Sequence, residues 1–273
     1  MEQLRVENFL VIKKAELNVS KICVIIGPQA SGKSVLAKLL HLFREFFDES
    51  TPRVIQDSEG EPIADLEETV CDIFVESFSK FFPGLPRDDH AFQIEYKSAE
   101  FSVLLQRDIE SGKPNVLFSE AYLDFLKKAN LEFSDSKQIL PKLKSDPHQD
   151  LYDPLVDFLR ASPIASPFRE ARKPSLFIPA SRAYFASVQK HIFSLLRARI
   201  PLDHLIVEFG FKYEVSRENY KSNFMGNQEK VEPLIQSILA GQYLFSKGED
   251  WILSTNGRVK LQHASSGQQE ALP

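Results

Sequence analysis

The sequence predicts an α/β fold with a mixed sheet, an added layer of antiparallel strands and a helical insertion. Residues 22–26 form a continuous apolar run, which is typical of a strand buried on both faces. A glycine-containing loop follows directly, and after it apolar residues recur at helical spacing. Near the end of the chain, Asn256-Gly257 lies between two short apolar runs, which is a strong hairpin signal.

The composition is that of a folded protein. Of the 273 residues, 43% are hydrophobic and 26% are charged, and the net charge is −5, which excludes wholesale disorder and a polycationic chain. No apolar run approaches the ~20 residues of a membrane span, and the first residues do not resemble a signal peptide. We therefore expect a cytoplasmic protein that makes no membrane contact. Cys23 lies inside the apolar run and is expected to be a buried, unreactive residue.

Short periodic segments predict the remaining elements. Strands are expected at residues 4–9, 12–19, 22–26, 92–96, 101–105, 175–179, 251–253 and 259–261. Helices are expected from the loop to about residue 48, from Asp65 to before Pro83, over much of 116–170, and from about 183 to Arg199. A polar loop is expected at about 50–62, and residues 205–208 are expected to form a core or edge strand.

These elements are expected in three segments. Residues 1–44 hold the first strands, the loop and the first helix of a core. Residues 45–170 form a mainly helical insertion with a strand pair near 91–106. Residues 171–273 complete the core and carry a second motif.

The loop matches the phosphate-binding pattern G-x-x-x-x-G-K-S in full. Its residues are Gly27-Pro28-Gln29-Ala30-Ser31-Gly32-Lys33-Ser34. The glycines let the backbone N–H groups approach an anion closely, and the following helix start adds its positive end. Lys33 supplies a cation for the β- and γ-phosphates, and Ser34 offers a hydroxyl to Mg²⁺. The pattern predicts binding of ATP with Mg²⁺.

A second helix start lies close to the end of the chain. Its residues are Ala264-Ser265-Ser266-Gly267-Gln268-Gln269-Glu270. Ser265 with Gln268 and Ser266 with Gln269 both have capping-box spacing, so either serine is a candidate for the N-cap of a helix. Free N–H groups, two hydroxyls and Gly267 would make this a second anion-seeking helix start. The alternative is a plain capped helix that follows a hairpin.

Taken together, these residues resemble the ABC-type ATPase superfamily. Residues 4–9, the loop and residues 264–270 are most similar to its SMC/RecF/OLD branch, and in particular to PtuA-like anti-phage ATPases. The second motif is similar to the L-S-G-G-Q signature, with Ala264 in place of Leu and Ser266 in place of the first Gly. The resemblance implies that two copies pack head to tail as a homodimer. Ser265 and Gly267 of one copy would then contact the γ-phosphate held by the other.

The resemblance also implies features that the sequence does not contain. The family's acidic Walker B strand and catalytic glutamate follow the signature, whereas this sequence ends three residues after Glu270. We therefore expect the N-terminal part of a longer ATPase, in which the sequence as given hydrolyses ATP negligibly and the catalytic residues are unknown. The family's Q-loop glutamine has only two weak candidates, Gln93 and Gln189.

Partners remain open from the sequence. The resemblance implies a nuclease partner in anti-phage defence. Residues 169–199 hold seven basic side chains and one acidic one, which suits either nucleic-acid contact or an ordinary solvated face. A nucleotide-sensing scaffold that binds ATP without hydrolysis is the alternative function.

Overall fold

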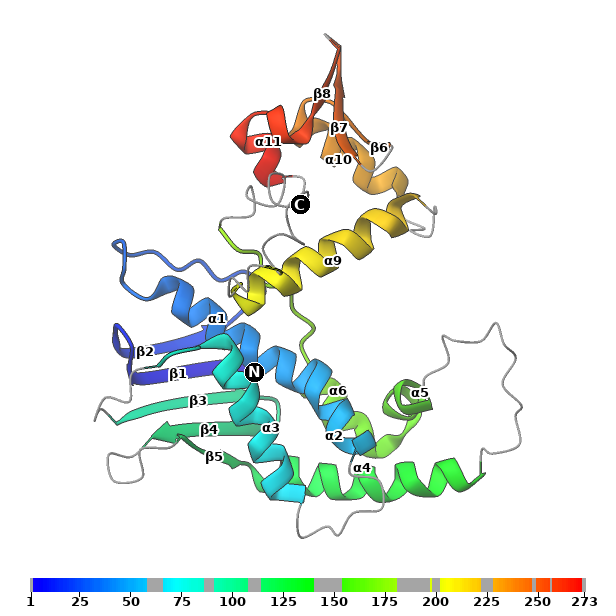
Figure 1. Ribbon diagram of the computed structural model, residues 1–273. Coiled ribbons are helices and arrows are strands. Elements are labelled where there is room, and N and C mark those ends of the chain that lie inside the picture. Colours follow the sequence, from blue (N-terminus) through cyan, green and yellow to red (C-terminus); the bar gives the residue numbers. More distant parts are fainter. Residues whose placement is uncertain are drawn as a thin grey trace. The chain divides into compact units, whose positions relative to one another are not determined.

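A computed structural model describes residues 2–57, 66–85, 91–107, 114–139, 154–180, 197, 202–221, 228–246, 249–255 and 257–271. The chain divides into two units, Met1–Ser175 and Leu176–Pro273 (Figure 1). The first contains the glycine-containing loop and the second contains residues 264–270.

The first unit is built on a five-stranded antiparallel sheet with the order β2-β1-β3-β4-β5. Its strands are β1 (Glu2–Phe9), β2 (Ile12–Val19), β3 (Phe92–Ser98), β4 (Phe101–Arg107) and β5 (Pro114–Phe118). The register places inward residues side by side, so that Leu4 faces Tyr96 and Ile94 faces Leu105. The strand pair expected inside the insertion thus continues the sheet that β1 and β2 begin.

One face of this sheet is buried and the other is polar. Helices α1 (Lys33–Glu45) and α3 (Leu66–Phe81) run across the buried face (Figure 1). Phe43 of α1 stacks on Tyr96 with ring centroids 4.9 Å apart, and Phe78 of α3 packs on Phe9 at 5.9 Å. On the opposite face, Arg5 forms exposed ion pairs with two glutamates across the strands. An aromatic core therefore holds α1, and with it the loop, against the sheet.

Further helices complete the first unit. They are a π-helical turn (Phe46–Ser50), α2 (Thr51–Asp57), α4 (Glu120–Ile139), α5 (Pro154–Ala161), a 3₁₀ turn (Pro163–Ala165) and α6 (Ser166–Ala171). Ser162 caps the 3₁₀ turn by accepting from the Ile164 N–H at 3.1 Å. Phe125 of α4 stacks on Phe168 of α6 with ring centroids 5.2 Å apart, which extends the aromatic core.

The second unit has a smaller core. It contains α9 (His204–Lys221), α10 (Gln228–Leu239), β6 (Gln242–Ser246), β7 (Glu249–Ser254), β8 (Gly257–Lys260), a 3₁₀ turn (Leu261–His263) and α11 (Ser266–Ala271). The three strands form an antiparallel sheet in sequence order. Leu239, Ile252 and Leu261 form the buried cluster that joins α10 to this sheet.

Several predictions from the sequence are confirmed. The fold contains both helices and sheets, with strands over 2–9, 12–19, 92–98 and 101–107 and a helix over 66–81. The predicted mixed sheet is not confirmed, because all pairings among the described strands are antiparallel. The hairpin at Gly257 is present as β7 and β8. In the part of the chain that the structure describes, no helix is long and apolar enough to cross a membrane.

The predicted strand at residues 22–26 is wrong. The segment is an irregular extended stretch, and Ile22, Val24 and Ile26 are 79%, 74% and 90% exposed. No described strand pairs with it, since the five-stranded sheet ends at β2. Without a neighbouring strand on either side, an apolar run gains neither a hydrogen-bond ladder nor burial. Cys23 is accordingly exposed, which corrects its expected burial.

Other boundaries also differ from the prediction. Residues 175–179 lie in an irregular segment with Leu176 and Ile178 about half exposed, and not in a strand. Residues 205–208 belong to helix α9, because Leu205 and Phe209 are both buried one turn apart. Helix α2 occupies part of the expected loop at 50–62, and β5 begins the stretch expected to be mostly helical. Most of the helix expected before Arg199 lies outside the described residues.

Candidate functional site

The loop at residues 27–34 leads into α1 through a left-handed residue. Gly32 is the residue before the helix and has φ +91°. A Cβ built at Gly32 would lie 2.6 Å from Ile12 Cγ1, and one built at Gly27 would lie 3.0 Å from Ser31 Oγ. Both glycines of the pattern therefore occupy places where a side chain would crowd the loop.

Lys33 folds back over the loop. Its Nζ donates a hydrogen bond to Gly27 O at 2.7 Å and another to Pro28 O, and lies 3.5 Å from Ser31 Oγ. One ammonium group thus bridges the beginning and the end of the motif. The loop's backbone thus surrounds a positively charged group. Such a group can form a charge-assisted hydrogen bond with a phosphate oxygen.

The start of α1 adds to the positive potential. The first N–H groups of a helix have no partner within it, and the first turn of α1 contains no acidic residue. Leu36 N–H donates to Gly32 O at 3.0 Å, which marks where the regular ladder begins. Ser34 is exposed one residue into the helix, as a metal-binding hydroxyl must be. Pro28, Gln29, Ala30 and Ser31 are also exposed, so the loop is open to a ligand. These residues fit a phosphate chain with its Mg²⁺.

The second motif is a capping box in which Ser265 is the cap. Ser265 N–H and Oγ both donate to Gln268 Oε1, at 3.1 and 3.0 Å, and Gln268 N–H donates to Ser265 Oγ at 3.3 Å. Gln269 instead binds backbone carbonyls behind the helix, at Gln262 and Ala264. Of the two serines that the spacing allowed, the structure therefore selects Ser265.

The other motif residues face outward. Ser265, Ser266 and Gly267 are exposed, and a Cβ at Gly267 would meet nothing within 4 Å. Gln268 Nε2 donates to Leu239 O at 2.7 Å, which ties the motif to the end of α10. The candidate residues thus form two contiguous groups, residues 27–34 in the first unit and 265–268 in the second.

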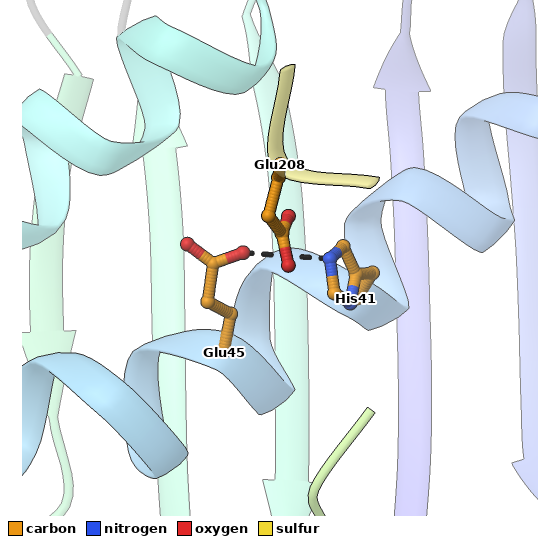
Figure 2. Close-up of side chains that lie close together, drawn as sticks. All are labelled: His41, Glu45 and Glu208. Carbon is orange, nitrogen blue, oxygen red and sulfur yellow. Dashed lines mark ion pairs between the residues drawn. The ribbon is translucent and has the colours of Figure 1, made fainter. Parts of the chain in front are cut away.

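A buried histidine on α1 was missed by the sequence reasoning. His41 is 4% exposed, and its Nε2 lies 3.4 Å from Glu45 Oε2, one helical turn away (Figure 2). Its Nδ1 lies 2.8 Å from Ser175 Oγ. The i, i+4 spacing of His41 and Glu45 was the signal in the sequence. Glu208, also drawn in Figure 2, lies on α9 of the second unit. Since protein metal sites take three or more ligands and α1 supplies two, we assign no metal to this pair.

A second buried polar cluster anchors the same C-terminal part of α1 to the sheet. Arg44 donates to both oxygens of Glu2 at 2.7 Å, and Tyr96 Oη donates to Glu2 Oε1 at 2.8 Å. The hydrogen bonds to Glu2 raise the pKa of Arg44. Burial, reinforced by the Glu2 carboxylate, raises the pKa of Tyr96 above its usual range. The cluster is fully paired, so we assign it a structural role.

Comparison with known proteins adds no family. No protein-family model matches the chain, and no curated protein matches it. Its assignment therefore depends on the residues described above.

Proposed function

We propose that this protein is an ATP-binding module of the ABC type. The single observation that supports the proposal is the loop at residues 27–34, with left-handed Gly32 ahead of α1 and Lys33 bridging the loop. ATP would bring the phosphate chain and Mg²⁺ to this loop. The loop's N–H groups and the start of α1 would bind the phosphates, Lys33 would exchange its carbonyl partners for phosphate oxygens, and Ser34 would bind Mg²⁺.

Nucleotide binding tests this proposal directly. We expect an N-methylanthraniloyl-ATP probe to gain fluorescence anisotropy with the wild-type chain in the presence of Mg²⁺. Lys33→Ala should weaken binding at least tenfold, because it removes a charge-assisted contact to phosphate. Lys38→Ala, on the same helix, is the matched control and should bind like wild type. Equal affinity of the Lys33→Ala and Lys38→Ala variants would contradict the proposal.

We further propose that ATP joins two copies of the chain, with Ser265, Ser266, Gly267 and Gln268 facing the partner's nucleotide. Exposure of Ser265, Ser266 and Gly267, and the open space around Gly267, support this second step. A nuclease partner and an anti-phage role stay predictions from the resemblance.

Sedimentation velocity with and without ATP tests the dimer. A Gly267→Val side chain has room in the single chain, so the fold should persist while ATP-dependent dimerisation is lost. Ala271→Val, on the exposed end of the same helix, should dimerise like wild type. ATP binding without any change in sedimentation would agree with the proposed nucleotide site and refute the proposed dimer.

A further inference from the structure

An arginine-lined hollow lies in the first unit, away from the glycine-containing loop. Its volume is about 440 Å³, within the range of small-molecule sites. The π-helical turn, α2, α5 and α6 supply its walls together with the residue that follows α6. The lining residues are Asp48, Glu49, Pro52, Arg53, Leu155, Leu159, Arg160, Phe168, Arg169 and Arg172.

Two of the four arginines are held by the fold. Arg172 pairs with Asp48. Arg169 Nη1 donates to Leu159 O at 2.9 Å and to Ser162 O at 2.8 Å, which satisfies carbonyls at the end of α5. These contacts fix two guanidinium groups at the wall and leave further N–H donors on each, since a guanidinium carries five.

The other two arginines have no such partner in the part of the chain that the structure describes. Arg53 and Arg160 are exposed, and neither forms a hydrogen bond or an ion pair with another described residue. The lining thus has four cationic and two anionic groups, an excess of two positive charges. Like charges gathered around one hollow repel, and an anion with two negative charges offsets that repulsion.

We infer that the hollow binds a phosphate monoester. Its charge of about −2 near neutral pH matches the excess of the lining, and its oxygens suit the planar fork of arginine. Pro52, Leu155, Leu159 and Phe168 add apolar wall beside the arginines, which suits the organic part of an ester. The source is a mononucleotide or the 5′-phosphorylated end of a nucleic acid. The inference goes beyond the proposed ATP site and does not depend on it.

The experiment uses the Lys33→Ala chain, in which binding at residues 27–34 is weakened. Fluorescence anisotropy compares a short single-stranded DNA that carries a 5′-phosphate with the same strand that carries a 5′-hydroxyl. Calorimetry measures AMP and inorganic phosphate. We expect the 5′-phosphate, AMP or both to bind about tenfold more tightly than the 5′-hydroxyl strand and inorganic phosphate, respectively. The tighter of the two esters identifies the source.

Paired variants then locate the site. Arg53→Gln with Arg160→Gln should weaken ester binding at least tenfold, because both unpaired guanidinium groups are lost. Lys13→Gln with Lys128→Gln changes the net charge equally at exposed positions on β2 and α4 and should leave binding within twofold. Three results would each overturn the inference. They are no preference for either ester (equal binding of the 5′-phosphate and 5′-hydroxyl strands together with equal affinity for AMP and inorganic phosphate), equal loss in both pairs of variants, and no binding of any probe. Because both pairs of variants are compared within the same Lys33→Ala chain, the difference between them reports on the hollow and not on the ATP proposal.

Discussion

Gly32 is constrained both by its backbone conformation and by the side chain packed beside it. Its φ of +91° lies where side chains are strained, and Ile12 fills the space beside it. We expect Gly32→Ala to lower the free energy of unfolding by about 1–3 kcal/mol, measured by urea denaturation. Adding Ile12→Ala removes the contact but not the backbone strain, so the double variant should lose less than the sum of the single changes.

Gly267 provides the control for that substitution. Its surroundings are open and it lies within a helix, so Gly267→Ala should change the free energy of unfolding by less than about 1 kcal/mol. If both alanine variants behave alike, the conformation of Gly32 carries no special cost.

The two cysteines should differ sharply in reactivity. Cys23 is exposed, whereas burial, with smaller effects of Glu67 and Asp72, raises the pKa of Cys71 from 9.0 to about 11. At pH 8 Cys71 then holds about a hundredth of the thiolate of an ordinary cysteine. Labelling with iodoacetamide, followed by mass spectrometry, should modify Cys23 fast and Cys71 slowly. Cys23→Ser should remove the fast phase. Two equal rates would contradict this difference.

Alkaline pH should destabilise the first unit. Burial raises the pKa of Cys71, Tyr96 and Tyr122 in the folded state, so the unfolded chain releases these protons first. The contribution is present below about pH 9, the ordinary value for Cys71, and is lost as pH rises toward about 11. Urea unfolding at several pH values should show this decline.

Tyr122→Phe should make the decline of stability with pH shallower. It should also cost about 1 kcal/mol at pH 7, because the contact with Thr51 is lost. Stability that is flat through pH 11 would refute the prediction.

At the scale of elements, the attachment of α1 to the sheet positions the loop. Phe43 stacks on β3, and at the end of the helix Arg44 binds Glu2 of β1, which is only 6% exposed. The helix is therefore tied to two neighbouring strands by both apolar and ionic contacts.

Removing one member of that ionic cluster should cost more than removing two. Arg44→Met leaves the Glu2 carboxylate buried without its cation, and we expect a loss of about 3 kcal/mol in the free energy of unfolding. Adding Glu2→Gln removes the buried charge and should restore a substantial part of that loss. A double-mutant cycle by urea denaturation measures the coupling. Strictly additive losses would show that the pair does not act as a unit.

At the scale of the whole molecule, residues 22–26 are either a buried strand, as their composition predicts, or an exposed segment, as the structure has them. Substitutions in this segment distinguish the two. If it were a strand buried on both faces, as its composition predicts, each polar substitution would cost about 1–3 kcal/mol. Since Val24 and Ile26 are 74% and 90% exposed, we expect Val24→Thr with Ile26→Thr to change the free energy of unfolding by less than about 0.5 kcal/mol.

A dye that binds exposed apolar surface gives an independent measurement. Fluorescence of anilinonaphthalene sulfonate should fall in the Val24→Thr/Ile26→Thr variant, because the apolar surface is reduced. Val6→Thr, at a fully buried position of β1, is the matched control for the free energy of unfolding, which it should lower strongly. Equal losses in the free energy of unfolding at residues 6 and 24 would show that residues 22–26 are buried, as the sequence predicts.

Much of the local structure could be predicted from short-range patterns. Residues 2–9 and 12–19 alternate as strands do, Gly257 turns a hairpin, and Gly32 ends the loop ahead of a helix. Each pattern brings together residues a few positions apart, so its physical cause is visible in the sequence. The choice between Ser265 and Ser266 was not visible, because both have the same spacing to a glutamine.

The sequence by itself determined the glycine-containing loop and a capped helix near residues 265–271, because turn geometry and capping are local interactions. Tertiary structure alone decided which apolar segments are buried. The phenylalanines of α1 and α3 pack on the sheet, whereas none of the described strands pairs with residues 22–26. It also brought Glu2 to Tyr96 and gathered Arg53 with Arg172 around one hollow. Burial and charge clustering depend on contacts between residues far apart in the chain, and no local pattern encodes them.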